Sequence, residues 1–256
     1  MAISLKSLKK GLEIKPPTII LYGVAGIGKS TWASEAPNPV FIQTEEGLNT
    51  LDVAKFPLAK NINDVYESIG ALVNEQHDFQ TLIIDSIDWF EKLVHIDVRK
   101  THGEDVFTDY GRGYKFATPY FEKLVDGLNV LRNEKGMAII LVGHAKVTPF
   151  NAPDTAAYDR YSIDLHKEAA TTIEEWAECI FFANYKVYVQ KEDGGFGKEV
   201  KKAAGKGDRI VYTQERPPYK AKNRYLLPHE LPMDFGSFSR AMAEGISKLK
   251  NKNKGE

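Results

Sequence analysis

The chain has 256 residues, of which 43% are hydrophobic and 27% charged, a composition that excludes a mainly disordered or collagen-like protein. Lys and Arg total 34 against 35 Asp and Glu, so the net charge of -1 excludes a protein that coats nucleic acid through bulk positive charge. No stretch approaches the roughly 18 consecutive apolar residues of a membrane span, and the N-terminus lacks the apolar core of a signal peptide. We therefore expect a cytoplasmic protein without membrane contact.

Short apolar strands alternate with amphipathic helices along the first part of the chain. Apolar, β-branched runs predict buried strands at residues 18–22, 40–43, 81–85 and 137–142. A short helix is expected at 29–36, and a longer one at 63–76, where apolar residues recur on one face. A further helix is expected to place residues 121–131 behind Pro119, a residue that suits the first helical turn. This alternation predicts an α/β fold, mainly a parallel sheet flanked by helices.

The pattern changes after about Trp176, where the sequence predicts antiparallel strands toward the C-terminus. Strands are expected at 179–190, 209–213 and 219–225, with a Gly-rich hairpin tip at 191–208. Cys179 lies in an apolar run, which indicates a packed thiol and not redox chemistry. We expect an N-terminal extension over 1–17, one main domain over 18–234, and a C-terminal helix with a basic tail over 235–256. The tail is either a frayed helix end or an arm for nucleic acid.

The first predicted strand runs directly into a P-loop motif. The sequence from Gly23 to Ser30 matches G-x-x-x-x-G-K-[ST], with a strand before it and a helix after it. Glycines let the backbone wrap a phosphate chain, Lys29 neutralises the β and γ phosphates, and Ser30 ligates Mg²⁺. The motif therefore predicts binding of a nucleotide, ATP, with Mg²⁺. The residues expected to hold the nucleotide are Gly23, Val24, Ala25, Gly26, Ile27, Gly28, Lys29, Ser30 and Thr31.

Three further side chains are expected near the nucleotide because each follows a predicted strand. Asp85 ends the strand at 81–85 and is the expected second Mg²⁺ ligand; a helix-capping role is the alternative. Glu45, next to Glu46, could orient the attacking water, or both could be solvated loop acids. His144 follows the strand at 137–142 and could sense the γ phosphate or be structural. The other five histidines lack metal-ligand spacing, so no zinc is expected.

These motifs together resemble the RecA-like ATPases, and within them small phage proteins of the Sak-type, ATP-binding or single-strand annealing group. The resemblance runs from about Pro17 to Pro228. Residues 41–48 resemble the RecA segment with the catalytic glutamate, at the position of Glu45, and residues 83–86 resemble its Asp-Ser Walker B strand. His144 stands where RecA has a nucleotide-sensing glutamine. The resemblance implies a RecA-like P-loop NTPase core and ATP hydrolysis stimulated by DNA.

Residues 220–228 resemble the RecA stretch that reaches the ATP of a neighbouring subunit. Lys222 and Arg224 fall on its two cationic positions, and cations two residues apart on a strand point to the same face. Their action in trans would place ATP between protomers of a homo-oligomer, a ring or a filament. Solvated charges at a sheet edge are the alternative. Residues 1–15 are a further segment that could pack on a neighbouring protomer.

Two stretches fall where RecA-like recombinases place DNA-binding loops. Residues 100–115 pair cations with aromatic rings that could stack on bases, and residues 146–167 do the same. Because both stretches also contain acids, ordinary loops are the alternative. The expected DNA-binding residues are Arg112, Tyr114, Lys115, Lys146 and Arg160.

The sequence thus favours an ATP-dependent protein that binds single-stranded DNA and promotes annealing or strand pairing in phage recombination. By the same resemblance it would act in the cytoplasm of a bacterial host, with a single-strand binding protein as a further partner. Two alternatives stay open: a nucleotide-dependent scaffold or loader for a replication protein, and a P-loop kinase. The sequence contains neither an Asn-Lys-x-Asp guanine motif nor a Leu-Ser-Gly-Gly-Gln stretch, which disfavours GTPases and ABC transporters.

Overall fold

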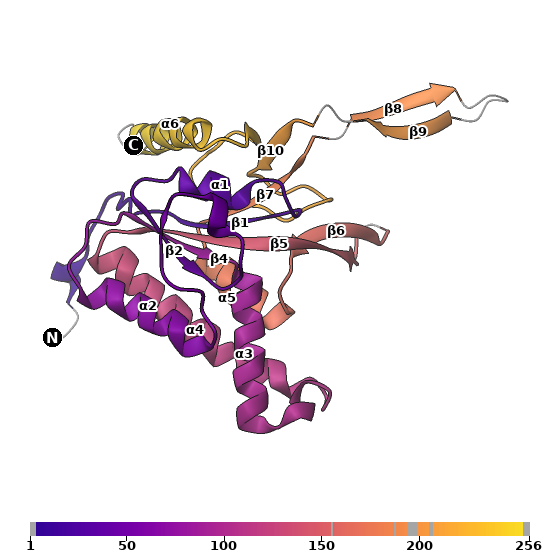
Figure 1. Cartoon of the computed structure of the whole chain (residues 1–256). Helices are drawn as coiled ribbons and strands as arrows, with labels where there is room; N and C mark the ends of the chain where they lie inside the picture. The colour runs from indigo at the N-terminus through magenta and orange to yellow at the C-terminus, as the bar shows by residue number, and fades with distance from the viewer. Residues whose placement is uncertain (1–3, 155, 187, 194–198, 205–206, 253–256) are drawn as a thin grey trace.

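The computed structural model describes residues 4–154, 156–186, 188–193, 199–204 and 207–252 (Figure 1). In this part of the chain, ten strands form one sheet and two more form a separate hairpin. The strands are β1 (Thr18–Gly23), β2 (Pro39–Gln43), β3 (Ala54–Lys55), β4 (Thr81–Asp85), β5 (Ala138–Phe150), β6 (Tyr158–Ile163), β7 (Cys179–Tyr185), β8 (Tyr188–Asp193), β9 (Glu199–Ala204), β10 (Arg209–Tyr212), β11 (Lys222–Asn223) and β12 (Glu230–Pro232). The helices are α1 (Lys29–Ser34), α2 (Ile62–Asn74), α3 (Ile87–His102), α4 (Arg112–Glu134), α5 (Lys167–Trp176) and α6 (Phe235–Lys252).

Parallel strands occupy the centre of the sheet. Its order is β12-β10-β7-β1-β5-β4-β2-β3, and all neighbours from β7 to β3 run parallel. The strands β10, β11 and β12 are antiparallel to their partners at the other edge. The predicted fold class is therefore confirmed: a mainly parallel sheet flanked by helices, with antiparallel strands toward the C-terminus.

Each central strand buries side chains on both faces, as a continuous apolar run requires. Alternate residues belong to opposite layers: Ile20 packs toward the layer of α2 to α5, and Ile19 and Leu21 pack toward α1 and α6. Figure 1 shows α1 and α6 on one side of the sheet and α2, α3 and α4 on the other. Cys179 is fully buried in the α1 and α6 layer, which confirms the prediction of a packed thiol.

The register of the parallel strands brings their carboxyl ends to one edge. Gly23 at the end of β1 lies opposite His144 on β5, and Gln43 at the end of β2 lies opposite Asp85 on β4. The segments that follow these strands must therefore meet at this edge, which is where parallel sheets place ligands. The P-loop, Glu45, Asp85 and His144 all belong to it.

One helical prediction needs correction, and one helix was not predicted. The helix expected at 121–131 is α4, which already begins at Arg112, so Pro119 lies in its interior and not in its first turn. Proline removes one hydrogen bond there, and its exposed position lets the helix continue around it. The helix α3 was not predicted. Only Ser86 lies between the end of β4 and the start of α3, so no glycine or proline marks the change from strand to helix.

The later strands also differ from prediction. The strand expected at 137–142 continues to Phe150 and pairs with β6 as a hairpin, and the strand expected at 219–225 is reduced to β11. The expected strand at 179–190 is divided into β7 and β8; β8 pairs with β9 as a hairpin whose tip, 194–198, lies outside the described residues. The last residues of the predicted basic tail, 253–256, lie outside them as well. None of the described helices is both long and apolar enough to span a bilayer.

Two helical glycines allow a matched test of how α6 packs. A Cβ at Gly245 in α6 would lie 1.9 Å from the carbonyl oxygen of Tyr225, whereas a Cβ at Gly70 in α2 would meet open space. We expect Gly245→Ala to destabilise the protein by roughly 1–3 kcal/mol through overpacking. Gly70→Ala should instead stabilise it by about 0.5–1 kcal/mol, because alanine loses less entropy in a helix. Urea unfolding midpoints measure both effects, and equal midpoints would contradict the close packing of α6.

Candidate functional site

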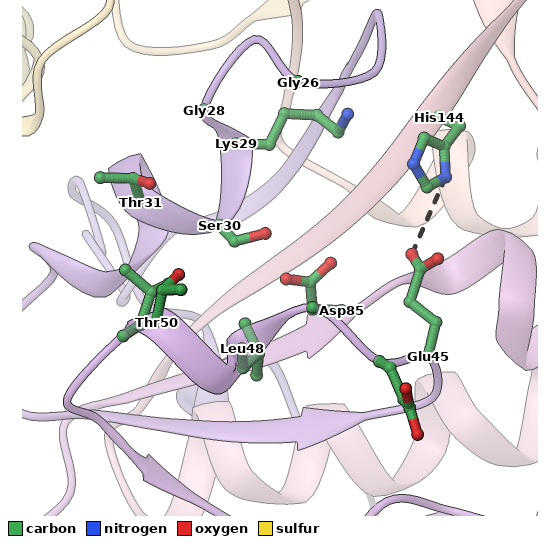
Figure 2. Close-up of a pocket in the computed structure, with 13 residues that line it drawn as sticks. Gly26, Gly28, Lys29, Ser30, Thr31, Glu45, Leu48, Thr50, Asp85 and His144 are labelled. Atoms are coloured by element: carbon green, nitrogen blue, oxygen red, sulfur yellow. Dashed lines mark ion pairs between the residues drawn. The ribbon is translucent and has the colours of Figure 1, made fainter.

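The loop between β1 and α1 adopts a conformation that requires glycine at several positions. Gly26 and Gly28 have positive φ angles of 72° and 101°, in the left-handed region. Gly23 packs so closely on β7 that an added Cβ would lie 2.2 Å from the carbonyl oxygen of Ala183. This loop and the neighbouring strand ends enclose a cavity of about 340 Å³ (Figure 2). The backbone can therefore wrap a ligand in the way a P-loop requires.

Most of the predicted P-loop residues face this cavity. Those that line it are Gly26, Gly28, Lys29, Ser30 and Thr31. Among the others, Gly23 ends β1, Val24 and Ala25 form the start of the loop, and Ile27 is fully buried in the core. Ile27 therefore anchors the loop while its neighbours face the cavity.

Lys29 is held inside the loop by backbone carbonyls. Its Nζ donates hydrogen bonds to the carbonyl oxygens of Gly23 and Val24, each at 3.1 Å. Burial lowers the pKa of the Lys29 ammonium, while the carboxylates of Asp85, Asp88 and Glu45 act in the opposite direction. The ammonium is thus fixed within the loop, where it would meet a bound phosphate.

Ser30 and Asp85 form the oxygen donor set expected for a magnesium ion. Figure 2 shows the Ser30 hydroxyl and the Asp85 carboxylate facing each other across the cavity floor. Burial raises the pKa of Asp85, and the Ser30 hydroxyl and Lys29 ammonium act against this rise. Because Mg²⁺ takes one or two protein oxygens together with phosphate and water, this pair fits the ion.

Glu45 enters the cavity from the segment that follows β2. A Glu45 carboxylate oxygen lies 3.8 Å from Nδ1 of His144, the contact drawn as a dashed line in Figure 2. Burial raises the pKa of the Glu45 carboxyl, and the nearby carboxylates of Asp88 and Asp85 add to the rise. A carboxylate with a raised pKa is a stronger base, which suits the predicted role of Glu45 toward water.

Asp88 was not predicted, yet it holds His144 in place. Its two oxygens accept hydrogen bonds from the backbone N–H and from the ring Nδ1 of His144, each at 3.0 Å. These bonds raise the pKa of His144, chiefly through the side-chain hydrogen bond, and favour the imidazolium. Burial alone would raise the pKa of Asp88, but the bonds from His144 lower it overall. The sequence could have indicated this role, because Asp88 follows Asp85 by three residues. That spacing places Asp88 beside the cavity only when a helix begins at Ile87.

Lys222 and Arg224 do not share a strand face as predicted. The strand β11 ends at Asn223, and Lys222 donates to the carbonyl oxygens of Glu174 and Glu175 at the end of α5, at 2.9 Å and 3.2 Å. Lys222 pairs with Ile180, near the amino end of β7 and away from the P-loop edge. Arg224 is exposed beyond the strand. The structure therefore does not bring these cations into the cavity of their own chain.

The two stretches predicted as DNA-binding loops are largely regular structure. Residues 100–115 include the end of α3, a 3-10 turn at Glu104–Phe107 and the start of α4. Residues 146–167 form the hairpin of β5 and β6 and the turn into α5. Backbone hydrogen bonds between β5 and β6 form a hairpin where a loop was expected. The many polar residues of this stretch had favoured the prediction of a loop.

Several predicted DNA-binding side chains are already engaged. The Tyr114 ring stacks on His166 with centroids 3.4 Å apart, so one face of the ring is covered. Arg160 is buried and pairs with Glu215 at 2.6 Å, which corrects its predicted role as a loop cation. Arg112 pairs with Asp109 at 3.0 Å but stays exposed, and Lys115 is exposed. Stacking and ion pairing inside the fold therefore already engage two of the predicted DNA-binding side chains.

A cationic cleft lies between the hairpin of β5 and β6 and the helix α5. It has a volume of about 480 Å³, and Lys146, Arg160, Lys167 and Lys220 line it. Glu174 is the one acid among the described lining residues. Lys146 donates to the carbonyl oxygen of Leu165 at 2.7 Å, so it also ties the cleft wall to β5. Each of these cations also has an acidic partner: Asp164 for Lys146, Glu215 for Arg160, Glu168 for Lys167 and Glu174 for Lys220. The cleft therefore gathers cations that a stronger anion could bind by displacing these partners.

Comparison with known families shows to which family the chain belongs. A family model described as an AAA domain matches residues 15–225, which is most of the chain. The chain belongs to this AAA domain family. The matched range contains every residue that lines the cavity and the cationic cleft, so the AAA domain carries both features.

Two individual proteins are similar to this AAA domain. The SPbeta prophage-derived uncharacterized protein YorG of Bacillus subtilis (strain 168) is 26% identical over 142 residues, which are 53% of this chain and 42% of that protein. The match thus spans less than half the length of this relative. The crystal structure of the RadB recombinase aligns with a TM-score of 0.43 and 12% sequence identity, over 80% of this chain and 84% of that chain.

The contact between Asp88 and His144 predicts a pH-dependent effect on stability. Asp88→Asn removes the charge that raises the pKa of His144, so this pKa should fall toward its ordinary value of 6.5. A histidine whose pKa is higher in the folded state than in the unfolded state stabilises the fold at pH values below the unfolded pKa. This contribution disappears as the pH rises through the folded pKa. The stability difference between wild type and Asp88→Asn should therefore be largest near pH 6 and shrink at higher pH.

NMR titration of the His144 ring and urea unfolding at several pH values measure these effects. Asp126→Asn, on the exposed side of α4, is the matched control and should leave the His144 titration unchanged. An unchanged His144 pKa in Asp88→Asn would contradict the assigned contact.

Proposed function

We propose that this protein is an ATP-dependent, RecA-like ATPase that binds single-stranded DNA and promotes annealing or strand pairing in phage DNA recombination. The observation that carries the proposal is a single cavity shared by the side chains that phosphoryl transfer needs. These side chains are Lys29, Ser30, Glu45, Asp85 and His144. The prophage origin of the similar YorG protein supports a phage context.

The cavity offers a group for each step of ATP hydrolysis. Lys29 would hold the phosphates, and Ser30 and Asp85 would hold Mg²⁺, which when bound neutralises phosphate charge. Glu45 takes a proton from water as the water oxygen bonds to the γ phosphorus. The bond from that phosphorus to the bridging oxygen breaks, and ADP keeps the electron pair.

His144 adds a cation at the place where negative charge is bound. Its ring faces the cavity from the middle of β5, and Asp88 fixes the ring orientation. Because the hydrogen bond that the His144 ring donates to Asp88 favours the imidazolium, His144 can also donate to a γ-phosphate oxygen. This interaction would distinguish ATP from ADP, as the sensing role requires.

Single-stranded DNA is assigned to the cationic cleft and to the exposed cations at the start of α4. Lys146 and Lys167 in the cleft, with Arg112 and Lys115 on α4, offer charges for a phosphodiester backbone, whereas Lys220 is already bound to Glu174. The stacking of Tyr114 on His166, which lines the cleft, joins the two groups into one surface. A single-strand binding protein is a further partner that would deliver or share this substrate.

Assembly into a ring or filament would complete the site from a neighbouring protomer. Lys222 and Arg224 lie away from their own P-loop, so contact with ATP requires the ATP of another copy. Leu5 and Leu8 in the N-terminal segment are 85% and 76% exposed, as expected for a segment that packs on a second protomer. ATP at the protomer interface would then couple hydrolysis to assembly.

Two substitutions test the assigned catalytic groups. Lys29→Ala should abolish Mg²⁺-dependent ATP binding, because the loop loses its phosphate cation. Glu45→Gln should keep ATP binding but slow turnover by roughly 10²–10⁴-fold, since it removes the general base. Calorimetry measures binding, and phosphate release measures turnover. Glu46→Gln is the matched control, at a more exposed residue that lines the same cavity. A loss equal to that of Glu45→Gln would contradict the assignment of Glu45 as the base.

Binding of single-stranded DNA should depend on the exposed cations. Lys115→Ala and Lys167→Ala should each weaken binding of a labelled oligothymidylate and reduce the salt slope by about 1, as expected for one lost phosphate contact. Lys135→Ala, at the opposite edge of the sheet, should change neither value. Fluorescence anisotropy at several salt concentrations, with ATP and Mg²⁺, measures the effect.

Hydrolysis assays separate the functional alternatives. ATP turnover without nucleic acid, with single-stranded DNA and with duplex DNA should show stimulation by single strands. An absence of oligonucleotide affinity at low salt would reject the DNA assignment. Turnover that neither DNA changes would favour a scaffold or loader for a replication protein, and phosphate transfer to another acceptor would favour a kinase.

A further inference from the structure

The helix α3 carries two buried carboxylates that point to different parts of the molecule. It begins directly after Asp85 and Ser86, so its first turn is fixed to the nucleotide cavity. Asp88 and Glu91 are three residues apart, about one helical turn, and only 6% and 9% exposed. Asp88 binds His144, as described above. Glu91 does not belong to the described lining of the cavity and has no role in the proposed hydrolysis.

Glu91 binds the backbone at the entrance to α5. Both of its oxygens accept the backbone N–H of His166, at 2.9 Å and 3.2 Å. His166 is the N-cap residue of α5, and it lines the cationic cleft. The carboxylate therefore sets the position of the cleft wall relative to α3.

Two further bonds tie the neighbouring residues to β5. The backbone N–H of Asp164 donates to the carbonyl oxygen of His144 at 2.8 Å. Nζ of Lys146 donates to the carbonyl oxygen of Leu165 at 2.7 Å. Three consecutive residues, 164 to 166, are thus each held by a group on β5 or α3. A displacement of either element would reach the cleft through them.

Burying the charged carboxylate of Glu91 costs desolvation free energy. Burial raises the pKa of Glu91 to about 7, and the His166 amide and the Lys146 charge only partly oppose the rise. An apolar residue of similar size would avoid this cost, although it could not accept the His166 N–H. The contact therefore fixes the position of His166 more than it stabilises the fold.

We propose that Glu91 is a positioning residue that couples the nucleotide cavity to the cationic cleft through α3. The inference rests on the proposed function, in which the cavity binds ATP and the cleft binds single-stranded DNA. When His144 engages a γ phosphate, Asp88 moves with it, and α3 carries this shift one turn along to Glu91. Glu91 then shifts His166, the start of α5 and the Tyr114 ring stacked on it. A packed helix transmits such small shifts because it moves as one body.

Hydrogen–deuterium exchange tests the coupling without relying on DNA. Peptides that cover residues 163–172 are compared with and without Mg²⁺ and ATPγS, in wild type, Glu91→Gln and Glu91→Asp. Glu91→Gln keeps the shape and removes the charge, whereas Glu91→Asp keeps the charge and shortens the reach. Glu122→Gln, on the exposed side of α4, is the matched control. Thermal unfolding verifies that each variant is folded.

The expected result is slower exchange at 163–172 in wild type when the nucleotide binds, by about fivefold or more. Both Glu91 variants should lose this change while the P-loop peptides keep their protection and basal ATP turnover stays within about twofold. A full nucleotide effect in both folded Glu91 variants would overturn the proposal. An absence of any change at 163–172 in wild type would overturn it as well.

Oligothymidylate affinity, measured with and without ATPγS, separates this inference from the proposed function. Wild type should bind the oligonucleotide about fivefold or more tightly with ATPγS, and Glu91→Gln should bind equally well in both conditions. If wild type binds no oligonucleotide but shows the exchange effect, the DNA assignment fails and the coupling stands. If wild type binds it and Glu91→Gln keeps the full nucleotide dependence, the coupling fails and the DNA assignment stands.

Discussion

The register of the parallel strands is the constraint on which the site depends. The pairing of Gly23 with His144, and of Gln43 with Asp85, brings the ends of β1, β2 and β4 to a single edge beside His144 on β5. A one-residue slip in any pair would exchange the buried faces of a strand and move its terminal side chain out of the cavity. The two apolar layers prevent such slips, because each strand is buried on both sides. Core packing therefore determines the geometry of the side chains that line the cavity.

Charge balance is the second constraint on this edge. Asp85, Asp88 and Glu45 surround the buried Lys29, and His144 adds a further group that can be charged. Charges removed from water are costly unless each has a partner, and here the partners are one another and the P-loop backbone. A bound magnesium ion and phosphate chain would bring both signs of charge into this network, so ligand binding can rearrange it without leaving a group unpaired.

The sequence predicted the parts of the site that depend on local order. The P-loop, Asp85 and the fold class follow from strands and motifs that are continuous along the chain. Contacts between distant segments were not predictable: Asp88 acts through His144, Tyr114 stacks on His166, and Lys222 caps α5. The interior position of Pro119 was missed for a related reason, because packing of α4 on its neighbours outweighs the local preference of proline.

The paired carboxylates of α3 show how specific geometry can justify an energetic cost. Apolar residues at positions 88 and 91 would pack well and avoid desolvation, but they could not accept hydrogen bonds from backbone segments. Asp88 and Glu91 each accept one such N–H, from His144 and His166. Because one helical turn separates them, the cavity and the cleft are tied to the same rigid element. A nucleotide-dependent protein needs such a link, since binding at one site can affect another only through an element that both sites bias.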